Sequence, residues 1–160
     1  ALPEVDESYP DTLSGEEIPL YISQEKAAAY RRFMKDNTLL ITADTIVWLD
    51  GKVYGKPRDI ADAKAMLQAL SGKTHTVITG VTLTSLQKQI SFTVSTEVTF
   101  AALGDDEIDY YVEKYRPLDK AGAYGVQEWI GYIGVTGLKG SYYNVMGLPI
   151  QRLYTELKKF

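Results

Sequence analysis

The sequence predicts an α/β protein in which helices flank a β-sheet. Three observations lead to this prediction: a near-continuous apolar, β-branched run at 38–49, alternating apolar and polar residues at 73–84 and 90–100, and intervening segments with apolar residues at helical spacing. At 160 residues, the chain is large enough for one well-buried core and too short for two ordinary domains. We therefore expect residues 1–160 to form a single domain.

The first elements lead up to the central strand. The first ten residues are rich in proline and acids and predict a loop, in which Asp6 and Glu7 are either metal ligands or solvated acids. Residues 18–35 place apolar side chains on one face and predict a helix that Ser23 could cap. On spacing alone, Lys26 is one of several surface cations of this helix.

The stretch 38–57 opens with an apolar, β-branched run that predicts a buried parallel strand, and this strand ends at a polar Asp44-Thr45 pair. A second short strand is predicted with a reversal at Asp50-Gly51. In open α/β sheets, ligands collect outside the carboxyl ends of the strands. Asp44 and Thr45 are therefore expected beside a substrate, and Lys56 follows closely after a glycine.

Residues 58–70 predict a second helix, with Asp59 as N-cap and Ser71-Gly72 as its stop. The alternating segments 73–84 and 90–100 predict two antiparallel strands joined by a hairpin. The single histidine, His75, lies on the first of them. Because no other histidine or cysteine accompanies it, we expect a hydrogen-bonded structural residue rather than a base.

A third helix begins at Asp105 and is ended by Pro117. In the segment 117–127, small residues alternate with glycine, which lets the backbone pass close to a neighbour or to a ligand, and both readings stay open. Asp119, Lys120 and Gln127 are the polar groups set into it. A strand, a glycine-punctuated loop and an amphipathic helix at the C-terminus follow.

Composition narrows the classes of function. The formal net charge is −4, cysteine is absent and one histidine is present, which excludes thiolate chemistry and multi-histidine metal sites. Nucleic-acid binding without sequence preference needs clustered Lys and Arg, so we expect no nucleic-acid partner. No apolar run approaches the roughly 20 residues of a membrane span and no signal peptide is visible, so we expect a soluble, cytoplasmic protein without a membrane partner.

The polar residues suggest water attack on a phosphorylated small molecule. In phosphoanhydride hydrolysis, cations stabilise charge on the phosphate oxygens and a carboxylate aligns or deprotonates the water. Asp44 supplies such a carboxylate, and Lys26, Lys56 and Lys120 supply cations. A divalent cation would rest on carboxylates, as Mg²⁺ prefers. Neither a Walker-type phosphate loop nor a dinucleotide fingerprint is present.

Eight runs of residues, in order and spacing, then resemble a known family. They are Asp6-Glu7-Ser8, Glu25-Lys26-Ala27, Ala43-Asp44-Thr45-Ile46-Val47, Gly55-Lys56-Pro57, Leu70-Ser71-Gly72-Lys73-Thr74-His75, Thr79-Gly80-Val81, the whole of 117–127, and Gly140-Ser141-Tyr142-Tyr143-Asn144-Val145-Met146-Gly147-Leu148-Pro149. Together they resemble the Maf (septum formation) family of nucleoside triphosphate pyrophosphatases over almost the whole chain.

The resemblance implies an α/β fold of the inosine-triphosphatase-like kind, an elongated mixed sheet flanked by helices with a central cleft, and often a homodimer. It also implies a reaction with a divalent metal cation, Mg²⁺ or Mn²⁺, in which a nucleoside triphosphate is cut between the α and β phosphates. By the same resemblance, Asp44 is the proton acceptor and a metal ligand, Glu7 is an acidic residue that helps to hold the metal, and Lys26 and Lys56 bind phosphates.

Thr45 and Gln127 match positions associated with base preference. A Thr after the Asp and a Gln in the Tyr-Gly-Val-Gln run resemble the branch that acts on dTTP and UTP. A side-chain amide donates and accepts at once, so Gln127 could pair with the carbonyl and N–H edge of a pyrimidine.

The family pattern also contains a strand and an arginine-containing loop upstream of the Asp-Glu pair that are not in this sequence, so we expect a longer natural N-terminus. Those arginines would grip a triphosphate bidentately. Two hypotheses remain: a pyrophosphatase acting on dTTP, UTP and modified pyrimidine nucleotides, or a protein that binds nucleotides or a cell-division partner without turnover.

Overall fold

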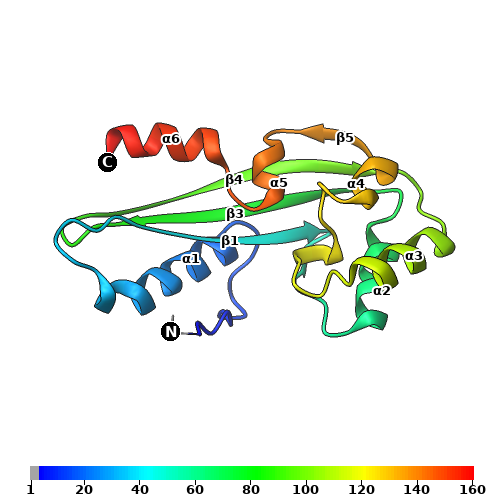
Figure 1. Cartoon of the computed structure of the whole chain (residues 1–160), viewed down its shortest axis with the longest axis horizontal. Coiled ribbons are helices and arrows are strands. Elements are labelled where there is room, and N and C mark those ends of the chain that lie inside the picture. Colours follow the sequence, from blue (N-terminus) through cyan, green and yellow to red (C-terminus); the bar gives the residue numbers. More distant parts are fainter. Residues whose placement is uncertain (1–3) are drawn as a thin grey trace.

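The structure is a computed structural model that describes residues 4–160, and the rest of the predicted N-terminal loop, residues 1–3, lies outside the described residues. Five strands form one elongated sheet in the order β2-β1-β3-β4-β5 (Figure 1). Helices flank this sheet, so the predicted α/β class is confirmed. The strands are β1 (Leu40–Leu49), β2 (Lys52–Tyr54), β3 (Thr74–Thr84), β4 (Gln89–Phe100) and β5 (Val135–Lys139).

Every neighbouring pair of these five strands is antiparallel. The parallel orientation predicted for residues 38–49 is therefore wrong, and across residues 4–160 the sheet is antiparallel where the resemblance implied a mixed one. The prediction failed because β1 is buried on both faces of the sheet. Ile46 of β1 packs with helix α1 (Glu17–Tyr30) on one face of the sheet, and Val47 enters the main core on the other. A strand covered on both sides has the same apolar pattern in either orientation.

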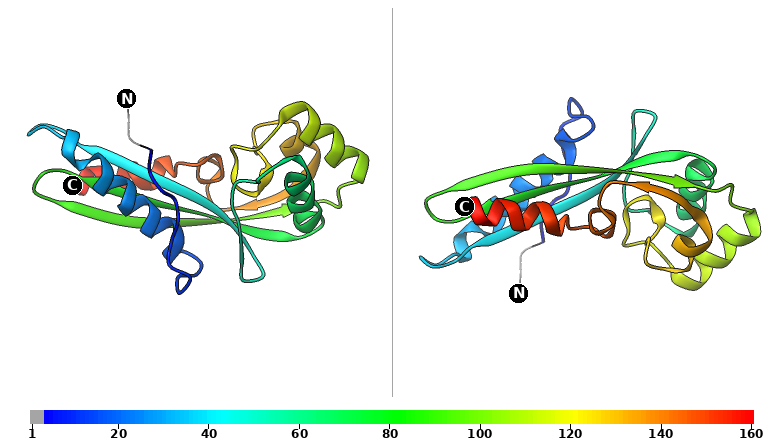
Figure 2. Two further views of the ribbon diagram at one scale, coloured as in Figure 1. Left: turned by 90° about the horizontal axis from the view of Figure 1, so that it is seen from below. Right: turned by 90° about the horizontal axis from the view of Figure 1, so that it is seen from above.

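The helices divide between the two faces of the sheet. Figure 2 shows α1 on one face and α6 on the other. Helices α2 and α3 gather at the end of the sheet away from α6 (Figure 1). Among residues 4–160, no helix has both the length and the apolar character of a membrane span. Besides α1, the helical elements are η1 (Arg31–Phe33), α2 (Ile60–Leu70), α3 (Asp105–Tyr115), η2 (Ala121–Ala123), α4 (Trp129–Gly134), α5 (Tyr142–Met146) and α6 (Ile150–Lys159).

Several local predictions are confirmed. Asp50 and Gly51 both have positive φ angles, 51° and 76°, as expected for a tight hairpin turn. The Asp59 carboxylate accepts a hydrogen bond from Asp62 N at 2.7 Å and caps α2. Gly72, with φ 69°, follows the end of that helix. The predicted hairpin is the β3–β4 pair.

The cap predicted at Ser23 is wrong. Helix α1 begins at Glu17, so Ser23 lies inside it, where its side chain is fully buried. Its hydroxyl donates to Leu20 O at 2.8 Å and lies 2.8 Å from Thr82 Oγ1 on β3. Because these contacts satisfy the hydroxyl within the protein, Ser23 fixes α1 to the sheet instead of starting it.

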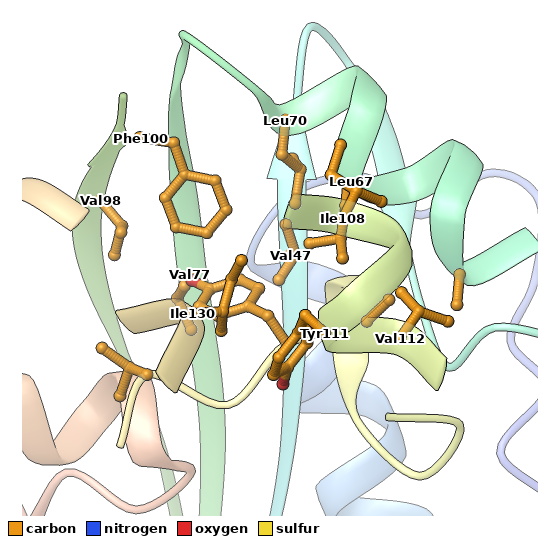
Figure 3. Close-up of a cluster of buried hydrophobic side chains, with 14 of the residues drawn as sticks. Val47, Leu67, Leu70, Val77, Val98, Phe100, Ile108, Tyr111, Val112 and Ile130 are labelled. Atoms are coloured by element: carbon orange, nitrogen blue, oxygen red, sulfur yellow. The ribbon is translucent and has the colours of Figure 1, made fainter. Parts of the chain in front are cut away.

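The main core lies between the sheet and helices α2 and α3 (Figure 3). Phe100 and Val98 of β4 meet Leu67 of α2 and Tyr111 of α3 there. A second cluster lies under α1, and a third is covered by Leu153 of α6. The sheet is thus packed at one end on two helices and at the other on α1 and α6, which leaves the middle of β1 available for a site.

His75 is a buried structural residue, as predicted. Its Nε2 atom lies 2.6 Å from the Tyr124 hydroxyl, and its ring packs edge-on against Phe100 with centroids 5.0 Å apart. Burial lowers the pKa of His75 to about 4. The imidazole is therefore neutral in the folded protein at pH 7.

Acid should therefore destabilise the protein through His75. The folded state holds the proton less tightly than the unfolded chain, so stability is fully present above pH 6.5 and falls as the pH drops toward 4. Denaturant unfolding at pH 7 and pH 4.5 measures the difference. Glutamine does not titrate in this range. We therefore expect the free energy of unfolding to fall between pH 7 and pH 4.5 by on the order of 2 kcal/mol more in the wild type than in His75→Gln. Equal losses would contradict this account.

Candidate functional site

A cavity of about 530 Å³ opens along the outer edge of β1. The short strand β2 pairs with residues 47–49 of β1, and the edge of residues 43–46 borders the cavity. Asp44 therefore lies within β1, not at a strand end as predicted from the sequence. The six predicted site residues all line this one cavity: Glu7, Lys26, Asp44, Thr45, Lys56 and Gln127.

Adjacent residues of β1 serve opposite sides of the sheet. Asp44 is directed toward α1, where it meets Lys26, whereas Thr45 meets Thr79 and the segment after α5. This follows from the alternation of side chains along a strand. The cavity thus joins the α1 face to the α5 face around the edge of β1.

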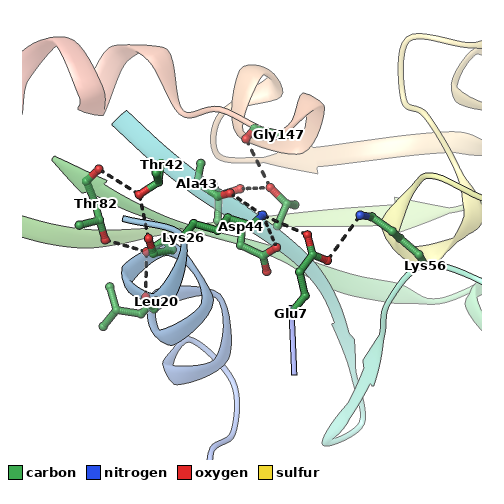
Figure 4. Close-up of polar contacts among 12 residues, drawn as sticks. Glu7, Leu20, Lys26, Thr42, Ala43, Asp44, Lys56, Thr82 and Gly147 are labelled. Carbon is green, nitrogen blue, oxygen red and sulfur yellow. Dashed lines mark hydrogen bonds and ion pairs between the residues drawn. The ribbon is translucent and has the colours of Figure 1, made fainter. Parts of the chain in front are cut away.

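Lys26 connects the carboxylates on the α1 side (Figure 4). Its Nζ atom lies 3.2 Å from Asp44 Oδ1 and 3.2 Å from Glu7 Oε1, and it donates to Ala43 O at 3.1 Å. An ammonium has three protons, and these contacts occupy them all. The surface position expected from helical spacing is wrong, because the N-terminal segment folds back and brings Glu7 to the helix.

The two carboxylates have opposite electrostatic environments. Burial is the main influence on Asp44 and raises the pKa of this carboxyl, although Lys26 acts in the other direction. Burial also acts to raise the pKa of Glu7, but the ion pairs with Lys26 and Lys56 outweigh it and lower the pKa overall. Two neighbouring carboxyl groups whose pKa values are shifted in opposite directions are typical of an active site in which one acts as a base and the other stays ionised.

Lys56 approaches Glu7 from the opposite wall, with Nζ 3.4 Å from Glu7 Oε2 (Figure 4). Its side chain is 56% exposed, so its ammonium stays accessible to a ligand. The lysine follows Gly55, whose carbonyl accepts a hydrogen bond from Gly122 N at 3.1 Å. This bond ties the β2–α2 loop to the segment 117–127.

The Thr45 hydroxyl is held by the protein. It lies 2.8 Å from Thr79 Oγ1 and 3.4 Å from Gly147 O. Asn144 is completely buried in α5 and donates through Nδ2 to Val77 O and Val94 O. Thr45 and Asn144 therefore fix α5, and with it the cavity wall at residues 145–147.

Segment 117–127 is both a close crossing and part of the cavity wall. A Cβ added to Gly122 would lie 2.7 Å from Val47 Cγ2, so glycine is needed for contact with β1. Asp119, Lys120 and Gln127 line the cavity. The two readings that the sequence left open are thus compatible.

The cavity also includes Tyr9, Tyr124 and Met146, which the sequence did not single out as site residues. Their spacing carried no signal, because aromatic and thioether side chains are common in cores. Asp6, in contrast, is not among the lining residues, and its carboxylate accepts hydrogen bonds from Ser8 N and Ser8 Oγ at 2.9 Å each. Of the Asp-Glu pair, Glu7 is the member that reaches the cavity.

The donor set suits Mg²⁺ or Mn²⁺ bound together with a phosphate ligand. Glu7 and Asp44 converge on one cation, the Lys26 ammonium, at 3.2 Å each. Within residues 4–160, no cluster of three or more His, Cys, Asp and Glu side chains is arranged for a metal. Mg²⁺ commonly uses one or two carboxylates and completes its shell with water and substrate phosphates, so two carboxylates fit this mode.

Comparison with known proteins identifies the family. The family model described as "Maf-like protein" matches residues 1–160. The chain belongs to the Maf family. Among its Maf relatives, a dTTP/UTP pyrophosphatase of Phocaeicola vulgatus is 68% identical over 158 residues, covering 99% of this chain and 82% of the relative. Proteins of the same name from Bacteroides thetaiotaomicron and Porphyromonas gingivalis are 65% and 55% identical, covering 82% and 81% of those relatives.

Proposed function

We propose that this protein hydrolyses dTTP and UTP to the nucleoside monophosphate and pyrophosphate. One observation carries the proposal: Glu7, Lys26 and Asp44, from three separate segments, form a single bonded cluster in a cavity that Lys56 and Gln127 also line. The names of the Maf relatives support the choice of substrates.

Asp44 is the general base in this proposal. It is buried to 11% exposure, and burial raises the pKa of its carboxyl, which makes the carboxylate a stronger proton acceptor than an ordinary aspartate. Lys26 holds Oδ1, so Oδ2 is assigned to take the proton from the attacking water. The water oxygen forms a bond to the α-phosphorus. The bond between the α-phosphorus and the oxygen that bridges it to the β-phosphorus breaks, and this oxygen leaves with pyrophosphate.

The phosphates are assigned to the cations at this end of the cavity. Lys56 is exposed, faces Glu7 and can donate to a phosphate oxygen. Lys26 on the opposite wall already donates to Glu7, Asp44 and Ala43 O, so it attracts the phosphates through its positive charge. Glu7 and Asp44 would hold a divalent cation, which would supply positive charge to the phosphate oxygens during cleavage. The lowered pKa of Glu7 keeps this carboxyl ionised for that role.

The nucleobase of the substrate is assigned to the other side of β1, between the cavity wall at residues 145–147 and Gln127. The amide of Gln127 can match one carbonyl and the N3–H group of uracil or thymine. Thr45 acts here by fixing the wall through Gly147 O.

A nucleotide panel tests the function. The protein is assayed with each common nucleoside triphosphate and with Mg²⁺ or Mn²⁺, and pyrophosphate release is measured. We expect dTTP and UTP to give the highest kcat/KM. Binding of dTTP without pyrophosphate release from any triphosphate would instead favour the non-catalytic alternative.

Removing the Lys56 ammonium should weaken substrate binding without unfolding the protein. A hydrogen bond to a charged group commonly contributes enough affinity for a 10- to 100-fold effect, so we expect Lys56→Met to raise KM for dTTP by about tenfold or more. The pair with Glu7 is exposed, and such pairs contribute little stability, so the melting temperature should stay near the wild-type value. Lys52→Met, outside the cavity on β2, is the matched control and should leave KM unchanged. An unchanged KM for Lys56→Met would remove Lys56 from the phosphate site.

A further inference from the structure

We infer that Lys120 determines base specificity by donating a hydrogen bond to a carbonyl oxygen of the pyrimidine. The inference rests on the proposed function and deepens it, because the phosphates are assigned there to Lys26 and Lys56, and Lys120, which the sequence suggested as a third cation for them, is given no role. Lys120 lies in segment 117–127 and lines the same cavity as Gln127.

Lys120 has one proton left for a ligand. Its Nζ atom lies 3.3 Å from Asp119 Oδ1 and 3.6 Å from Glu128 Oε1. An ammonium carries three protons, so these two carboxylates leave a third donor. The side chain is 29% exposed, which is consistent with a group at the cavity wall.

The core holds Lys120 in place through Glu128. Glu128 Oε1 accepts a hydrogen bond from the Tyr111 hydroxyl at 2.9 Å, and this hydroxyl in turn accepts one from Gly125 N at 3.0 Å. Tyr111 is completely buried in the main core (Figure 3). The anion that pairs with Lys120 is therefore hydrogen-bonded to a side chain of the main core.

Gly125 provides the space for this ion pair. A Cβ at this position would overlap Glu128 Oε1 and would lie 3.0 Å from Lys120 Cε. The Lys120 side chain thus crosses the bare backbone of Gly125 on its way to Glu128. A residue with a side chain at position 125 would therefore disturb the ion pair between Lys120 and Glu128.

The charges around Lys120 favour a neutral acceptor over a phosphate. Asp119 and Glu128 together outweigh its single positive charge. In the Glu7 cluster, by contrast, Lys26 and Lys56 balance the two carboxylates, and a bound divalent cation would make that group positive. Phosphates should therefore bind at the Glu7 cluster, and we assign the nucleobase to the part of the cavity lined by Gln127 and Lys120.

The chemistry of the base supplies a partner for the third proton. The pairing edge of uracil and thymine has a carbonyl, an N–H group and a second carbonyl. The Gln127 amide offers one donor and one acceptor, so it leaves one carbonyl unmatched. We assign Gln127 to the carbonyl at position 2 and the N3–H group, and Lys120, a donor, to the carbonyl at position 4. Cytosine carries an amino group in place of the carbonyl at position 4, and an ammonium facing this group would leave two donors opposed.

Lys120→Met tests the inference through the ratio of kcat/KM for dTTP to that for dCTP. We expect this ratio to fall about tenfold or more, mainly through slower dTTP turnover. Lys64→Met is the matched control, since Lys64 pairs with two carboxylates, Asp109 and Glu113, outside the cavity. Its ratio should stay at the wild-type value. Where dCTP turnover is too slow to measure, the dissociation constants of dTMP and dCMP give the same ratio.

An equal loss on dTTP and dCTP would overturn the inference, because it would mean a phosphate contact. An unchanged ratio would overturn it as well. Lys120→Gln keeps a donor and should recover part of the ratio, which a purely structural lysine would not do, and it serves where Lys120→Met fails to fold. Failure of the proposed function is read separately, from wild-type protein that hydrolyses no triphosphate, and the dTMP and dCMP constants then still test Lys120.

Discussion

Asp44→Asn should lower kcat for dTTP by about 10³-fold, the central part of the range for loss of a general base. The amide can still accept a hydrogen bond from Lys26, so the cluster with Glu7 should keep its arrangement. The change removes proton acceptance and a metal ligand while preserving shape. Steady-state kinetics with dTTP and Mg²⁺ measure the effect.

The same variant should not be less stable. Burial raises the pKa of Asp44 in the folded protein, so the ionised carboxylate lowers the free energy of unfolding at pH 7, and a neutral amide relieves this cost. We expect the melting temperature at pH 7 to equal or exceed that of the wild type. Asp109→Asn, an exposed change on α3, is the control and should keep full activity. Activity of Asp44→Asn within a few-fold of the wild type would refute the assignment of the base.

The ionisation of the Asp44 carboxyl should also determine how activity depends on pH. The base must be ionised to work, so kcat/KM for dTTP should fall as the pH drops through the pKa of Asp44. Because burial raises the pKa of this carboxyl, the titration of Asp44 in the metal-free protein, followed by NMR, should have its midpoint above the 3.8 of an ordinary aspartate. A midpoint at or below 3.8 would contradict a buried base.

Gly80→Ala should destabilise the protein by on the order of 3 kcal/mol, at the upper end of overpacking effects. Gly80 lies on β3 opposite Asp44 of β1 and faces α1. A Cβ there would overlap the backbone of Pro19 and would lie 2.5 Å from Leu20 N. Since backbone atoms cannot rotate away, the helix itself must shift.

That shift should also reach the site. Helix α1 carries Lys26, which bonds Asp44 and Glu7, so moving the helix separates the three groups. We expect a higher KM for dTTP in addition to a lower free energy of unfolding, measured by denaturant titration. Gly137→Ala is the matched control, because its Cβ would meet Thr99 at an ordinary 3.7 Å on β5. If both variants were equally stable, the close approach of α1 would not be essential to the fold.

The residues of the site could be predicted from the sequence better than their arrangement. Asp44, Thr45 and Lys56 were expected beside a substrate because they lie at or shortly after the end of a predicted strand, and the resemblance to the Maf family implied a site role for Gln127. All four line the cavity. The orientation of β1 could not be predicted, because a strand covered on both faces looks the same whether its neighbours are parallel or antiparallel.

Contacts between distant segments were also hidden. Helical spacing predicts Lys26 to be a surface residue. It bridges two carboxylates because the N-terminal segment brings Glu7, 19 positions away in sequence, against α1. Likewise, Gly80 appeared as one residue of a short motif. Its function in letting α1 approach depends on which helix crosses that strand, which no local pattern encodes.

We propose that the Glu7, Lys26 and Asp44 cluster cleaves dTTP between its α and β phosphates. The decisive measurement is separation of the products after incubation of wild type and Asp44→Asn, in parallel, with dTTP and Mg²⁺. The wild type should yield dTMP and pyrophosphate in equal amounts, and the variant should yield neither above background. Release of single phosphate with dTDP, or equal product from both proteins, would contradict the claim.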